Sequence, residues 1–142
     1  MNAQKSLLLV CALIVGLSGK VLADEATDKK IKGVRKAIDV CIELLEKRDF
    51  EGFVNKATHP SRAAFLSKTD ESRKKCLNAL KRDRDEIISA LKASKTMEPV
   101  FQASTDPKEE KAVFVFEKSI LRDREVMLMQ FRERDGIWYF LD

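Results

Sequence analysis

The chain has 142 residues and a formal net charge of +4, with 27 basic and 23 acidic side chains and one histidine. Hydrophobic residues make up 44% of it, which is enough for a packed core and too many for an intrinsically disordered chain. The 35% of charged residues argue against an integral membrane protein, and five glycines and three prolines exclude a collagen-like or low-complexity chain. The length fits one domain.

The first 23 residues have the layout of a secretory signal peptide. Lys5 lies in a short polar start, and Leu7 to Leu17 form an apolar run that is too short for a transmembrane helix, which needs about 20 residues. Val21 and Ala23 suit the small-residue pockets of a signal peptidase, so we expect cleavage after Ala23. The mature protein is then exported, periplasmic or secreted, with residues 24–142 as one domain and no integral membrane segment.

The mature chain carries a small and mixed charge. Residues 1–23 hold two lysines and no acids, so 25 basic and 23 acidic side chains remain, a net charge of +2. A nucleic-acid-binding domain usually shows a strongly basic face, so no nucleic-acid partner is expected.

Two cysteines, Cys41 and Cys76, remain after cleavage. Export favours a disulfide, and these two allow one pairing. The closed loop is about 35 residues long, for which the chain-entropy model gives about 3–4 kcal/mol of stabilisation. The alternative is two reduced thiols that pack as small hydrophobic groups. No metal site and no cofactor are expected, since two cysteines and the distant His59 do not supply tetrahedral ligand spacing.

Helical periodicity dominates the first two thirds of the mature chain. The spacing of apolar residues predicts helices over residues 27–48, 49–57 and 70–93, with one further turn at 61–66. Pro60 ends the second helix, and Thr69 is expected to cap the third. Cys41 and Cys76 fall on the apolar stripes of the first and third helices, which favours the bridge between them.

After Ser94 the pattern changes to β-branched and aromatic runs. These predict strands over residues 112–116, 126–131 and 137–141, after a short extended stretch at 100–101. Asp135-Gly136 is typical of a two-residue hairpin turn, and Arg122-Asp123 is expected to turn the preceding pair. The expected fold class is α+β, with three N-terminal helices packed on a curved antiparallel sheet of three to four strands.

Both faces of the predicted sheet are apolar. Val113 and Val115 alternate with Phe114 and Phe116, whereas a sheet with one solvated face alternates apolar and polar residues. One face can pack on the helices. The second face needs a partner chain, a ligand or the chain's own third helix.

Three passages carry a likeness to a known family: the helix end at Leu44–Phe50, the loop at Ala57–Pro60 and the final hairpin at Phe131–Trp138. Together with the order of elements, they resemble the nuclear transport factor 2-like superfamily, whose fold is a cystatin-like α+β cone. The resemblance implies a cone that often encloses an apolar pocket and dimers that form through the sheet. The superfamily includes ketosteroid isomerase-like and dehydratase enzymes and many non-catalytic binding domains, so the fold does not choose among them.

No catalytic residues are expected. Glu117, Gln130 and Tyr139 are polar groups in the strands, but no aspartate or histidine maps onto a catalytic motif of that superfamily, and Glu117 is typical of a solvated strand end. His59 is expected to bond loop backbone instead of serving in a triad with Ser61.

Arg84 interrupts the apolar stripe of the third helix. Its guanidinium either binds an anionic group in a pocket or lies at the surface, paired with neighbouring acids. The candidate ligand-binding residues are Arg84, Gln130, Trp138 and Tyr139.

The sequence thus favours an exported, non-catalytic binding or protein-interaction module. It would use a cone pocket or the apolar sheet face and take a small apolar ligand or a protein partner. The alternatives are an isomerase- or hydratase-like enzyme in the same pocket and a structural homodimer with a filled core.

Overall fold

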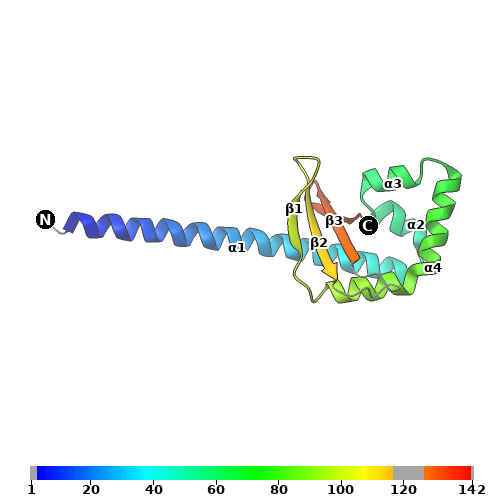
Figure 1. Ribbon diagram of the computed structural model, residues 1–142, viewed down its shortest axis with the longest axis horizontal. Helices are drawn as coiled ribbons and strands as arrows, with labels where there is room; N and C mark the ends of the chain where they lie inside the picture. The colour runs from blue at the N-terminus through cyan, green and yellow to red at the C-terminus, as the bar shows by residue number, and fades with distance from the viewer. Residues whose placement is uncertain (1–2, 117–126, 142) are drawn as a thin grey trace. The chain divides into compact units, whose positions relative to one another are not determined.

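The computed structural model describes residues 3–116 and 127–141 (Figure 1). The helices are α1 (Ala3–Glu46), α2 (Phe50–Gly52), the π-helical turn η1 (Phe53–Ala57), α3 (Pro60–Leu66) and α4 (Asp70–Ser94). The strands are β1 (Val100–Ala103), β2 (Glu110–Phe116), β3 (Met127–Arg134) and β4 (Ile137–Phe140). The fold class is therefore α+β, with the helices before an open antiparallel sheet. The expected turn at Arg122-Asp123 and the candidate Glu117 lie outside the described residues.

The chain forms two compact units, residues 1–32 and 33–142. The described part of the first is helical throughout, so the expected helix start at residue 27 is wrong. The leucines and alanines of this segment are strong helix formers, which explains the extension. Across the described residues, no helix has an apolar stretch long enough to cross a membrane. The core and the sites described below belong to the second unit.

Local capping sets the ends of the helices. After α1, Arg48 takes a positive φ of 57°, and the carboxylate of Asp49 accepts a hydrogen bond from the backbone N–H of Gly52 at 2.8 Å. Thr69 caps α4 as predicted: its hydroxyl accepts from the backbone N–H of Ser72, whose own hydroxyl accepts from the N–H of Thr69.

The four strands form a meander in the order β1-β2-β3-β4. The turn between β3 and β4 has positive φ at both central residues, 53° at Asp135 and 80° at Gly136, as the hairpin prediction required. Register and alternation place Phe114, Phe131 and Trp138 on one face of the sheet. That inner face forms the core together with apolar side chains of α1 and α4.

Helix α1 approaches the sheet closely at Gly33. A Cβ atom added there would lie 2.7 Å from Cδ1 of Trp138, so a side chain at this position would displace the indole. Further along α1, Val34, Ile38 and Leu45 are fully buried against the sheet and α4.

The outer face of the sheet carries exposed apolar side chains. Val115 of β2 lies opposite Leu128 of β3, and the two are 46% and 48% exposed. Val100 of β1 is also exposed, whereas its partner Val113 is buried.

The predicted disulfide is not formed. Both thiols are free: Cys41 is buried in the core, and Cys76 is partly exposed on α4. Arg84 contacts the last turn of α1 through the carbonyl of Leu45. On α4, Cys76 precedes Arg84 by about two helical turns, or roughly 12 Å, so it lies beyond the end of α1. Cys41 lies one helical turn before Leu45, within α1. Because the helices run past each other with this offset, the two stripes do not bring the sulfurs together.

Candidate functional site

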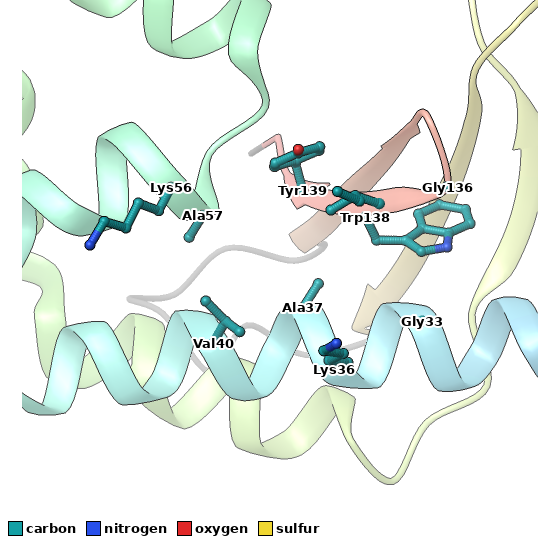
Figure 2. Close-up of a pocket in the computed structure, with 10 residues that line it drawn as sticks. Gly33, Lys36, Ala37, Val40, Lys56, Ala57, Gly136, Trp138 and Tyr139 are labelled. Atoms are coloured by element: carbon teal, nitrogen blue, oxygen red, sulfur yellow. The ribbon is translucent and has the colours of Figure 1, made fainter.

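A hollow of about 230 Å³, which we call the edge hollow, lies beside β4 (Figure 2). Trp138 and Tyr139, two of the predicted ligand-binding residues, line it from β4. From α1, the side chains of Ala37 and Val40 point toward β4 (Figure 2). Lys36 of α1 and Lys56 of η1 also line the hollow, and the side chain of Lys56 extends away from β4 (Figure 2). The hollow is therefore an apolar trough with basic groups beside it.

A larger cavity of about 460 Å³, which we call the apolar groove, lies between η1, α3, α4 and the end of β4. Its apolar walls include Phe53, Leu66, Leu80, Ile87, Phe140 and Leu141. Arg62 of α3 and Lys75 and Asp83 of α4 also line it. The two cavities share no lining residue.

The thiol of Cys76 also faces the apolar groove. Partial burial raises its pKa above the ordinary value, and the positive charges of Arg62 and Arg73 oppose that rise without reversing it. The thiol is therefore protonated at neutral pH and contributes a soft, weakly polar wall instead of a nucleophile.

A polar cluster built on two buried side chains, which we call the His59 cluster, joins His59, Glu109, Arg132 and Arg134. The Nε2 atom of His59 lies 3.3 Å from Oε1 of Glu109. The other contacts of this carboxylate are with Nε of Arg134 at 3.1 Å and with Nη1 of Arg132 at 3.6 Å. The side chains of His59 and Glu109 are 1% and 5% exposed, so their interactions are little screened by water.

The ring of His59 also caps α3. Its Nδ1 accepts from the backbone N–H of Ser61 at 3.3 Å and lies 2.7 Å from the Ser61 hydroxyl. The ring was expected to bond loop backbone, whereas its backbone partner is the first turn of α3. The backbone N–H of His59 donates to the carbonyl of Phe140, which fixes this loop along β4. Neither His59 nor Glu109 lines the edge hollow or the apolar groove.

The charge state of His59 makes stability depend on pH. Burial lowers the pKa of His59, Glu109 opposes this shift, and the cationic Arg132 and Arg134 reinforce it. A histidine with a lowered folded-state pKa stabilises the fold above its unfolded value of about 6.5 and loses that contribution as the pH falls below it.

We expect His59→Asn, which keeps a capping oxygen, to remove this dependence. Between pH 8 and pH 5, the wild type should lose stability relative to the variant, as urea unfolding at each pH can measure. A wild type that gains stability relative to the variant on acidification would show that Glu109 holds the ring in its charged form.

The four predicted ligand-binding residues do not converge. Trp138 and Tyr139 meet at the edge hollow, but Gln130 lies on the outer face of the sheet, opposite Val113. Arg84 donates from Nε to the carbonyl of Leu45 at 2.8 Å and from Nη2 to that of Glu46 at 3.3 Å. It also pairs with Asp85. Its guanidinium therefore satisfies free carbonyls at the end of α1 and lines neither cavity.

Sequence reasoning missed Glu109 and its two arginines. The alternation of Arg132 and Arg134 along β3 was the available signal, since it places both on one face of the strand. Within residues 3–116 and 127–141, no group of three or more His, Cys, Asp or Glu side chains is arranged to hold a metal ion.

Comparison with known proteins finds no family model, no curated protein and no solved structure that matches this chain. The function is therefore inferred from the geometry of the described residues.

Proposed function

We propose that this chain is an exported binding module that holds a small apolar ligand in the apolar groove. The observation that carries the proposal is the groove itself, a cavity of about 460 Å³ with apolar walls from helices and strand. Pockets for small molecules usually measure about 300–1,000 Å³ and combine apolar walls with a few polar groups. Arg62, Lys75 and Asp83 supply such groups here.

Three polar groups near the groove are not arranged for catalysis on a ligand held in it. The Cys76 thiol stays protonated, and the buried His59 and Glu109 lie outside the lining of the groove. General acid–base catalysis needs a titrating group within hydrogen-bond reach of the substrate. His59 and Glu109 are therefore not placed to act as acid or base on a ligand in the groove.

Export and the finer fold belong to the same proposal. The apolar run ending at Leu17 and the small residues Val21 and Ala23 support a cleaved signal peptide. The order of helices followed by an antiparallel sheet supports a cone-like arrangement resembling the nuclear transport factor 2-like superfamily.

The proposal predicts saturable binding of 1-anilinonaphthalene-8-sulfonate, whose fluorescence rises in apolar surroundings. With about 21 non-hydrogen atoms at about 0.3 kcal/mol each, the dissociation constant should be about 20–30 μM. One molecule should bind per chain, as fluorescence titration and calorimetry can establish.

The variant Ala79→Phe tests whether the probe occupies the groove. Ala79 lines the cavity from α4, so a phenyl ring there fills part of it and should weaken binding at least about tenfold. Ala64→Phe is the matched control, because Ala64 is an exposed helical alanine of α3 outside the lining. Equal binding by both variants, or no saturable binding by the wild type, would contradict the proposal.

A further inference from the structure

The edge of β4 that faces away from β3 carries backbone hydrogen-bonding groups at Trp138 that no described backbone group pairs with. Arg134 and Ile137 flank the two-residue turn and pair with each other, so successive residues after Ile137 direct their N–H and C=O to opposite sides of the strand. The carbonyl of Phe140 points away from β3 and accepts from the N–H of His59 at 2.7 Å. The backbone N–H and C=O of Trp138 point the same way as those of Phe140, away from β3. Among the described residues, no backbone partner reaches Trp138 across this edge.

The far end of the same edge is already bridged by the chain itself. Thr58 forms a parallel β-bridge with Phe140, which shows that this side of β4 accepts extended backbone. The bridge covers one end of the strand and leaves the stretch from Gly136 to Tyr139 beside the edge hollow.

The edge hollow suits an extended segment better than a compact small molecule. Its volume of about 230 Å³ lies below the roughly 300–1,000 Å³ of typical small-molecule pockets. A peptide that adds to a strand edge needs only a trough, since main-chain hydrogen bonds supply affinity and shallow subsites take alternate side chains. Ala37 and Val40 offer such an apolar subsite, and Trp138 closes the end of the trough (Figure 2).

The charge beside the hollow is positive. Lys36 of α1 and Lys56 of η1 are the charged residues among those that line it, and both are exposed. In the described part of the chain, neither lysine is paired with a carboxylate. Two lysines without a carboxylate partner beside a trough favour an occupant with acidic side chains.

We infer that the open edge of β4 binds an extended peptide segment in which acidic and apolar residues alternate. One residue of the segment pairs its backbone with Trp138, an apolar side chain covers Ala37 and Val40, and acidic side chains lie near Lys36 and Lys56. This surface is a second site, because it shares no lining residue with the apolar groove.

The test uses the acetylated and amidated peptide Glu-Ile-Glu-Ile-Glu. Trp138 is the one tryptophan of the chain, so both its fluorescence and its amide resonance report on this edge. The peptide should shift the Trp138 amide in a saturable way. The peptide Lys-Ile-Lys-Ile-Lys should bind at least about tenfold more weakly, because its charges repel both lysines.

Two further arms separate charge from backbone pairing. The double variant Lys36→Glu/Lys56→Glu should lose about tenfold in affinity for the acidic peptide and bind the basic peptide more tightly than the wild type does. Lys74→Glu/Lys81→Glu, a matched pair of exposed lysines on α4, should change neither affinity by more than about twofold.

On the unaltered protein, N-methylation of both isoleucines of the acidic peptide should abolish the Trp138 amide shift, because it removes peptide donors.

Three results would overturn the inference. They are an unchanged Trp138 amide at saturating peptide, equal binding of the acidic and basic peptides, and a stable dimer in sedimentation whose Trp138 amide is already protected. The last result would assign the edge to a second copy of the chain. Loss of dye binding at the apolar groove would leave this test unaffected, so the two sites succeed or fail separately.

Discussion

The substitution Phe131→Ala is expected to lower the free energy of unfolding by about 3–5 kcal/mol, the usual cost of removing a buried aromatic side chain. Phe131 is fully buried on β3, between rings of both neighbouring strands. Its centroid lies 6.2 Å from that of Phe114 and 5.7 Å from that of Phe140, and both rings meet it edge-on. Close-packed neighbours on two strands cannot fill the space without moving, so a cavity remains.

Chemical denaturation of the purified protein measures this loss. The control is Phe65→Ala on α3, where the ring is 65% exposed and its removal should change stability by no more than about 0.5 kcal/mol. Because small domains are usually stable by about 5–15 kcal/mol, the first variant should unfold at far lower denaturant. Similar midpoints for both variants would show that the sheet and helices do not enclose Phe131.

The second large effect is expected for Glu109→Gln. Removing the charge leaves Arg132, Arg134 and His59 without the carboxylate that they share. Breaking a buried ion pair usually costs about 3–5 kcal/mol, and the 43% exposure of the Arg134 side chain lowers the expected loss to about 2–4 kcal/mol.

A matched control is Glu98→Gln, which removes an exposed pair with Arg35 at 3.8 Å and should change stability by less than about 1 kcal/mol. Glutamine preserves the shape of Glu109, so a difference between the two variants reports on charge. Urea unfolding at pH 7.5 is the measurement, where His59 is neutral in both folded and unfolded chains. If Glu109→Gln costs no more than Glu98→Gln, the His59 cluster does not stabilise the fold.

Local patterns in the sequence predicted most of the helices and strands described in the second unit. The stripe over residues 70–93 and the cap at Thr69 predicted α4 nearly to its end at Ser94. Asp135-Gly136 predicted the β3-β4 turn, because few other residue pairs adopt positive φ twice in succession. These features depend on neighbouring residues, which the sequence shows directly.

Features that depend on the offset between distant elements were not predictable. Cys41 and Cys76 each lie on an apolar stripe, but periodicity does not tell how far α4 slides past α1. The role of Arg84 depends on the same offset, because the carbonyls that it bonds belong to Leu45 and Glu46. The prediction of where α1 begins was wrong for another reason. The segment expected to be a signal peptide has a high helix propensity of its own.

In the candidate site too, features set by neighbouring residues were predicted and features set by the packing of distant elements were not. Trp138 and Tyr139 were predicted to contact a ligand and meet at one hollow, because neighbours on an edge strand stay together. The His59 cluster joins a loop before α3, a loop before β2 and strand β3, which no local motif connects. The apolar groove likewise combines residues from Phe53 to Leu141, so its existence is a property of packing.

The most direct test is a set of intermolecular nuclear Overhauser effects between 1-anilinonaphthalene-8-sulfonate and methyl groups of the protein. Binding in the apolar groove predicts contacts from the aromatic protons of the probe to the methyls of Leu66, Leu80 and Ile87, which line the cavity from α3 and α4. Contacts confined to Val115 and Leu128, the exposed pair on the outer face of the sheet, would contradict it and assign binding to that face instead.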